Sequence, residues 1–454
     1  MANDLPRRKF LRQAACSAVG TSALISTIMD LYAVNAAAQS APDYKALVCI
    51  FQFGGNDSSN MLVPRSGGPY GSYAAIRGAL ALPQGQILPI SPLNPDGIDF
   101  GLHPSMIGLQ ALFQQQKVAF VRNVGTLVAP VTRQQYMQGG SAIPSQLFSH
   151  SDQTLQWQTS YTARNGPVTG WGGRIADLLT SLNGTSQVSL SIALNGSNTF
   201  QIGENVFQLQ ISPWGTVSLE GYDVEHPMDP ETRAMSREIR REHANVFEQA
   251  YAATVRRALD SDAFVKAALE SQPAITTVFP DTWLGSQLQM AARMIQAQAA
   301  LGQRRQIFFC GIGGWDTHDE QLQDHADLLA ELSTAMTAFY LATAEIGKAN
   351  QVTTFTASDF GRTFASNGRG SDHGWGGHHI VMGGAVQGGR LYGRYPQLVI
   401  EGPDDTDSGR WIPTTSVDEY AATLARWFGV PASDMPLVFP NIGRFAAPNL
   451  GFLG

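Results

Sequence analysis

A continuous, largely apolar run near the start of the chain, from Lys45 to Phe53, most constrains how this sequence can fold. Such a run, without polar alternation, is typical of a strand buried on both faces of a parallel sheet. Similar runs recur along the chain and are separated by helical patterns. The further runs are 117–121, 306–312, 352–357 and 379–382, and the clearest helical patterns are 104–113, 282–301 and 320–346. The sequence therefore predicts an α/β fold, a three-layer αβα sandwich around a mostly parallel central sheet.

Residues 187–225 interrupt this alternation. Apolar and polar residues alternate there, and the pairs Asn195-Gly196 and Trp214-Gly215 are typical of tight turns. We expect antiparallel hairpins in this segment, which would form a β-rich insertion or cap. The remaining pattern predicts a single α/β domain that spans residues 39–454.

The first 38 residues have the three regions of an export signal. Arg7-Arg8 with Phe10-Leu11 precedes an apolar run over 14–31, and small residues follow up to Ala38. Paired arginines in this context predict a twin-arginine signal peptide over residues 1–38, cleaved near Ala38. We therefore expect a periplasmic or extracellular protein, with the twin-arginine translocase as a transient partner. No later stretch reaches about 18 apolar residues, so no membrane span is expected.

Composition narrows the classes of partner. Only 15% of the residues are charged and the net charge is −7, with no Lys/Arg block after the signal. Nucleic acid is therefore not an expected partner. Cys49 and Cys310 each lie in an apolar run, where a free, buried cysteine is the simpler expectation, and a disulfide between them stays open.

Candidate ligands follow the ends of three predicted strands. Asp57 follows the first run, Asp316 and His318 follow the run at 306–312, and Asp359 follows the run at 352–357. Because the carboxyl ends of parallel strands meet at one edge of a sheet, these side chains should converge there. A turn or helix-cap role is the alternative for each aspartate taken alone.

A glycine-rich segment at 370–379 adds the densest group of histidines. It contains Asp372, His373, His378 and His379 among several glycines, which let closely spaced side chains converge. Imidazole and carboxylate are the ligands that zinc prefers, so we expect one or two divalent ions, with magnesium, calcium or manganese as alternatives. Neighbouring residues of a strand face opposite ways, which leaves open whether His378 or His379 points inward.

These motifs, in their order along the chain, resemble those of the DUF1501 family of twin-arginine-exported bacterial proteins. The resemblance covers nearly the whole mature chain and rests on Gly54-Gly55-Asn56-Asp57, Trp315-Asp316-Thr317-His318, Asp359-Phe360-Gly361-Arg362-Thr363, Ser371-Asp372-His373-Gly374 and Gly383-Gly384. That family is similar to the alkaline phosphatase and sulfatase superfamily. The resemblance implies an alkaline phosphatase-like fold with two metal positions. It implies that Asp57, Asp372 and His373 hold one ion, and that Asp316, His318 and either His378 or His379 hold the other.

The resemblance also implies a nucleophile and an anion-binding group. Ser149, or less favourably Ser151, is the expected nucleophile, and a helix N-cap is the alternative for Ser149. Arg362 is expected to bind an anionic substrate, and a structural salt bridge is the alternative. Trp171, Trp315 and Trp375 lie beside candidate ligands, where they either line a pocket for a sugar or aromatic group or simply pack.

Two departures limit the comparison. The spacing Asp316-x-His318 is shorter than the usual Asp-x-x-x-His, and no Cys/Ser-x-Pro-x-Arg motif exists, which excludes a formylglycine-dependent sulfatase mechanism. The expected activity is metal-dependent hydrolysis of a phosphate or sulfate ester of a small molecule or polysaccharide, by a metal-activated serine or water. The alternative is a non-catalytic exported binding or assembly protein that keeps the fold.

Overall fold

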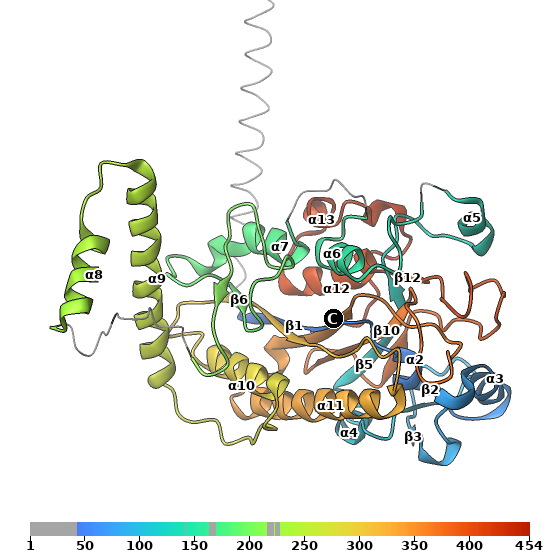
Figure 1. Ribbon diagram of the computed structural model, residues 1–454. Helices are drawn as coiled ribbons and strands as arrows, with labels where there is room; N and C mark the ends of the chain where they lie inside the picture. The colour runs from blue at the N-terminus through green and yellow to red at the C-terminus, as the bar shows by residue number, and fades with distance from the viewer. Residues whose placement is uncertain (1–42, 141, 163–168, 216–221, 223–227) are drawn as a thin grey trace, which may run out of the picture. The chain divides into compact units, whose positions relative to one another are not determined.

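The computed structural model describes residues 43–140, 142–162, 169–215, 222 and 228–454 (Figure 1). The predicted twin-arginine signal, residues 1–38, lies outside these residues, so it stays a prediction. Residues 44–454 form one compact unit. None of the helices in the described part of the chain combines the length and apolar character that a membrane crossing needs.

A large mixed sheet occupies the centre of this unit. Its strand order is β11-β5-β10-β9-β1-β8-β6-β7, and the short β12 also pairs with β5. The strands are β1 (Lys45–Gln52), β5 (Val118–Gly125), β6 (Ser191–Ala193), β7 (Leu209–Gln210), β8 (Arg305–Ile312), β9 (Val352–Ser358), β10 (Gly377–Gly383), β11 (Arg390–Tyr392) and β12 (Thr415–Ser416). Only β10 runs antiparallel to its neighbours. The carboxyl ends of the parallel strands and the amino end of β10 therefore share one edge.

Helices lie on both faces of the sheet (Figure 1). On one face, Val48 and Cys310 belong to a core shared with α4 (Ile107–Gln114), α10 (Trp283–Gln296) and α11 (Gln321–Glu345). The other face is covered by α6 (His150–Thr159), α7 (Trp171–Leu179) and α12 (Val417–Phe428). There the Phe355 ring lies 5.6 Å from that of Trp171 and 6.1 Å from that of Tyr420, centroid to centroid. The predicted strands of the sheet are confirmed, and so are the three predicted helices, which correspond to α4, α10 and α11 on the first face. The sequence did not predict α6 on the other face.

The remaining elements lie around this body. A small antiparallel sheet, in the order β2-β4-β3, occupies part of the segment between β1 and α4. Together with the helices around the body, the elements outside the main sheet and its covering helices are α2 (Ser58–Met61), β2 (Leu62–Pro64), α3 (Gly67–Arg77), β3 (Leu88–Pro89), β4 (Phe100–Leu102), α5 (Arg133–Gln138), α8 (Pro230–Arg240), α9 (Val246–Glu270) and α13 (Met435–Val438). The sequence did not predict the small sheet, because its strands have only two or three residues each.

The structure corrects the prediction of antiparallel hairpins over residues 187–225. In the described part of this segment, β6 pairs in parallel with β8, and β7 pairs in parallel with β6, so both extend the main sheet. Ile192 lies opposite Phe308, so the short apolar strand β6 pairs along the edge of β8. Residues 216–221 and 223–227 lie outside the described residues.

The two cysteines of the body are free and buried. Cys49 lies opposite Phe309 in the sheet, while Cys310 lies opposite Ile50. Because adjacent residues of a strand face opposite ways, the two thiols lie on opposite faces of the sheet. This arrangement rules out the disulfide that the sequence left open.

Candidate metal centre

Loops from different parts of the chain meet at the carboxyl edge of the sheet. The loop after β1 approaches the loop after β8 so closely that a side chain at Gly54, which has φ +117°, would collide with the backbone nitrogen of Asp316. A side chain at Gly370 would likewise collide with the backbone of His318. These two glycines let the backbones pack directly against each other, so their neighbouring polar side chains converge.

Asp316, His318 and His373 form the centre of this convergence. The Oδ1 atom of Asp316 lies 2.9 Å from Nε2 of His318 and 3.2 Å from Nε2 of His373. The two Nε2 atoms are themselves 3.0 Å apart. Three ligand-type atoms from two loops thus point at a common position at the solvent-accessible edge of the sheet.

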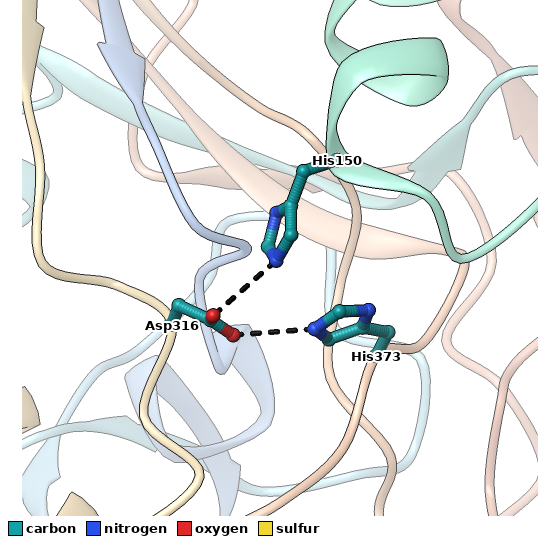
Figure 2. Close-up of side chains that lie close together, drawn as sticks. All are labelled: His150, Asp316 and His373. Atoms are coloured by element: carbon teal, nitrogen blue, oxygen red, sulfur yellow. Dashed lines mark hydrogen bonds and ion pairs between the residues drawn. The ribbon is translucent and has the colours of Figure 1, made fainter.

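His150 approaches the same carboxylate from the start of α6. Figure 2 shows His150 and His373 pointing toward Asp316 from separate elements. The Nε2 atom of His150 lies 3.4 Å from Oδ2 of Asp316. Two overlapping groups of candidate ligands result, and His373 belongs to both. They are His150, Asp316 and His373, and His318, Asp372 and His373.

In two of the imidazoles, those of His150 and His373, a hydrogen bond at Nδ1 fixes the tautomer. The Nε2 atom, which faces the cluster, is then left with a lone pair. Nδ1 of His150 lies 2.7 Å from Oδ2 of Asp359, and Nδ1 of His373 lies 2.7 Å from the carbonyl oxygen of Phe148. Both partners are acceptors, so each Nδ1 donates and each Nε2 is an acceptor. Nε2 of His150 is buried and has no hydrogen-bond partner among the described residues. Two imidazole lone pairs that face a carboxylate in this way form a suitable setting for a cation.

The distances fit one divalent ion. Donor atoms bound tetrahedrally to zinc at 2.0–2.2 Å lie about 3.4 Å apart, and the separations around Asp316 are close to that value. Asp372 lies farther out, with Oδ1 3.9 Å from Nδ1 of His318, and its other oxygen accepts a hydrogen bond from Arg410 at 2.9 Å. Asp316 and His373, with His318 and His150 on either side, are therefore the best-fitting ligands.

The electrostatics of the cluster favour the metal-binding protonation states. Partial burial alone would raise the pKa of Asp316, but the hydrogen bond and charge of Arg362 outweigh it, so the pKa lies below its usual value. Burial lowers the pKa of His373, although the hydrogen bond to Phe148 opposes this shift. A carboxylate and a neutral imidazole are the forms that bind a metal ion. Burial raises the pKa of Asp359, although hydrogen bonds from His150 and Gly54 oppose it.

Asp57, predicted as a ligand, does not join the cluster. Its buried carboxylate forms a close ion pair with Arg77 and a close hydrogen bond with Gln321. The Arg77 guanidinium also donates to the carbonyl oxygens of Thr363 and Phe364 at 3.3 and 3.2 Å. Asp57 therefore neutralises a buried arginine, which ties α3 to the loop after β9.

His378 and His379 are core residues of β10 rather than members of the cluster. Nδ1 of His378 accepts a hydrogen bond from the backbone N–H of Asn123 at 3.0 Å, and the ring of His379 packs 4.7 Å from that of Trp157. They face opposite sides of the sheet, and burial lowers the pKa of each to about 3. Both imidazoles are neutral packing groups that lie outside the cluster, so the structure corrects the prediction that His378 or His379 is a ligand.

Arg362 has the structural role that the sequence left as the alternative. Its side chain is buried and donates to Asp316 Oδ1 at 2.6 Å, to the carbonyl oxygen of Gly54 at 3.1 Å, and closely to that of Ser371. The guanidinium thus holds three loops of the site together. It has no exposed donor with which to bind a substrate anion.

Ser149 stands at the N-cap position of α6, but its hydroxyl does not cap the helix. The hydroxyl donates to Oδ2 of Asp152 at 2.7 Å. Its two neighbours, Phe148 and His150, both contact the cluster, so Ser149 lies beside it. The nucleophile role of Ser149 stays a prediction.

Two members of the site were missed or undervalued. The sequence presents His150 only as a neighbour of Ser149, and nothing in its spacing shows that α6 returns to the edge of the sheet. Asp359 stood out as a strand-end carboxylate, and its role toward His150 follows only from the folded chain. Trp171, Trp315 and Trp375 are buried packing residues, so they line no open pocket.

Comparison with known proteins gives distant structural likenesses. The chain is similar to Ps i-CgsB in complex with k-i-k-neocarrahexaose, at 10% identity and a TM-score of 0.34, over 89% of this chain and 77% of that chain. It is also similar to the PsFucS1 sulfatase from Pseudoalteromonas sp., at 9% identity and a TM-score of 0.31, over 89% and 72% of the two chains. A third likeness is to the phosphonate monoester hydrolase of Agrobacterium radiobacter, at 9% identity and a TM-score of 0.32, over 85% of this chain and 74% of that chain. At these TM-scores the likenesses assign no function to this chain.

No curated protein matches the sequence. The family model described as a protein of unknown function (DUF1501) matches residues 44–405, which is most of the chain and includes every ligand of the candidate metal centre. The chain therefore belongs to the DUF1501 family.

Proposed function

We propose that this protein is a metal-dependent hydrolase of phosphate or sulfate esters. The observation that carries the proposal is the convergence of three imidazole Nε2 atoms, from His150, His318 and His373, on the Asp316 carboxylate. Asp316 and His373 would hold the ion, with His318 and His150 as further ligands. Three imidazoles in the set favour zinc over magnesium, calcium or manganese, which prefer all-oxygen sites. One ion is proposed rather than two, because Asp57, His378 and His379 serve elsewhere.

The ligands are held in place by the residues behind them. Asp359 and the Phe148 carbonyl orient the two imidazoles, and Arg362 orients the Asp316 carboxylate. Such outer partners fix the tautomer and direction of each ligand before substrate arrives. A divalent ion bound there supplies Lewis-acid polarisation of the ester and lowers the pKa of the attacking hydroxyl or water.

The attacking group is proposed to be Ser149 or a water molecule. Ser149 lies between two residues that contact the cluster, and Asp152 already accepts the hydrogen of its hydroxyl at 2.7 Å. Asp152 would therefore take the proton when Ser149 attacks. If water attacks instead, removal of the Ser149 hydroxyl leaves most of the activity.

The setting of this activity also belongs to the proposal. We infer an alkaline phosphatase-like three-layer sandwich, which the helices on both faces of the sheet support. The paired arginines at positions 7 and 8 support export through the twin-arginine translocase to the periplasm or beyond. The substrate would then be an ester of a small molecule or of an extracellular polysaccharide.

One observation favours a second candidate, a non-catalytic exported binding or assembly protein with a structural ion. The two arginines nearest the cluster, Arg362 and Arg410, both bind carboxylates and carbonyl oxygens of the protein itself. Neither is free to bind an anionic ester. An ion that only ties loops together needs no such group.

Metal analysis with a substrate panel separates these candidates. The purified chain is expected to contain about one zinc and to hydrolyse p-nitrophenyl phosphate, bis-p-nitrophenyl phosphate or p-nitrophenyl sulfate. His373→Ala should lose both properties, while His243→Ala, a histidine of the α8–α9 region, should keep them. Bound metal without turnover of any ester selects the non-catalytic candidate, and absence of metal eliminates the hydrolase.

A further inference from the structure

Two tryptophans at the surface differ from the buried tryptophans near the metal centre. Trp214 is 76% exposed and Trp283 is 46% exposed. Their ring centroids are 5.8 Å apart and the ring planes are inclined by 54°. Exposing two indoles together is costly in water, so a paired arrangement points to a ligand that covers it.

The backbone holds both indoles in position. Trp214 lies in a tight turn in which Ser212 and Gly215 exchange backbone hydrogen bonds of 3.0 and 3.1 Å. Trp283 is the first residue of α10, which Thr282 caps, and its indole N–H donates to Oδ1 of Asn195 at 3.0 Å. Because the turn and the helix are already formed, little conformational entropy remains to be lost when a ligand binds.

The tryptophan pair belongs to the same edge of the sheet as the metal centre. Asp316 follows β8, Asn195 follows the adjacent β6, and Trp214 follows β7, and these three strands are parallel. Neighbouring strands are about 4.8 Å apart, and Asp316 packs against Gly54 after β1, three strands from β7, so the loop after β7 lies roughly 15 Å along the edge from the metal centre. A ligand a few sugar units long spans that distance.

We propose that Trp214 and Trp283 form a stacking platform for a polysaccharide chain whose ester group reaches the metal centre. Pyranose rings have C–H faces that stack on the electron-rich faces of indoles, and their hydroxyls need polar partners at the edge. Asn195 and Ser212, which contact the two tryptophans, supply such partners. This proposal rests on the proposed hydrolase function and names its substrate class as a polysaccharide ester.

Affinity electrophoresis tests the platform directly. The full chain is run through gels that contain κ-carrageenan, fucoidan or dextran sulfate, and the Kd is taken from the retardation. At least one polymer should retard the wild type, and Trp214→Ala should raise the Kd about tenfold or more. Trp214→Phe should retain most of the binding. Phe207→Ala, which removes an aromatic side chain that is 81% exposed elsewhere, is the matched control and should bind as the wild type does.

The same gels, run with and without a chelator, separate this proposal from the proposed function. Binding by the platform should survive chelation, since stacking needs no metal. If the protein binds no zinc but Trp214→Ala still weakens the retardation, the platform is supported and the hydrolase is contradicted. No retardation by any polymer, or equal retardation of Trp214→Ala and Phe207→Ala, overturns the platform even if the ester hydrolysis stands.

Discussion

His373 and His378 belong to the same glycine-rich segment, yet the structure puts them in opposite environments. His373 precedes β10 in a loop, where its Nε2 atom faces another imidazole and a carboxylate. His378 lies inside β10, where its ring is buried beside Tyr395 and accepts a backbone hydrogen bond. Residue type and spacing are therefore poor guides to a metal site. What matters is whether an imidazole lone pair finds a donor within the fold or faces other acceptors.

The largest difference between the two regions should appear when the loop imidazole is removed. His373→Ala is expected to abolish zinc binding and ester hydrolysis, a loss greater than the roughly 10–100-fold typical of an outer-shell partner. The stability of the metal-free protein should change little, because this side chain is partly exposed. Zinc content and turnover are measured against urea unfolding of the chelated protein. A variant that keeps its zinc would show that the ligand set is wrong.

Removing a buried imidazole of β10, that of His379, should have the reverse effect. His379→Ala leaves a cavity beside Trp157 and is expected to lower the free energy of unfolding by about 2–4 kcal/mol. Zinc bound per folded chain should not change, since no ligand is lost. Urea denaturation with parallel metal analysis gives both values. Unchanged stability with lost zinc would place His379 at the metal after all.

Acid should weaken the strand region through the same histidine. Burial lowers the pKa of His379 to about 3 in the folded state, so between pH 6.5 and 3 the unfolded chain binds more protons and stability falls as the pH falls. From pH 7.5 to 5 this group costs on the order of 2 kcal/mol. Over that range, unfolding of His379→Gln should be less pH-dependent than unfolding of the wild type by about that amount. Equal slopes would contradict the assignment of a buried neutral imidazole.

A smaller effect is expected behind the cluster. Asp359→Asn weakens the hydrogen bond that orients His150, so zinc affinity should fall by about tenfold, or about 1.4 kcal/mol. Competition with a chromogenic chelator measures this change. The fold should persist, because the amide can still accept the hydrogen bonds from His150 and Gly54. An unchanged affinity would mean that His150 does not bind the ion.

The sequence predicted the body of the fold and half of the site for the same reason. Continuous apolar runs identify buried strands, and parallel strands bring their ends together, so Asp316, His318 and Asp359 could be placed at one edge. His373 was a candidate only because of its glycine-rich segment and the family resemblance. The rest depended on contacts between distant segments. Asp57 is neutralised by Arg77 from an irregular segment, and His150 reaches the site only because α6 folds back. The strands β6 and β7 have too few residues to signal their partner.

X-ray absorption at the zinc edge of the loaded protein tests the central claim most directly, because it counts the kinds of atom bound to the ion. The account predicts one ion with at least two imidazole nitrogens and a carboxylate oxygen, from His373, Asp316 and at least one of His150 and His318. Replacing His373 by alanine should remove the signal. Sulfur ligands, fewer than two imidazoles, or an unchanged spectrum in that variant would contradict a metal centre at this edge of the sheet.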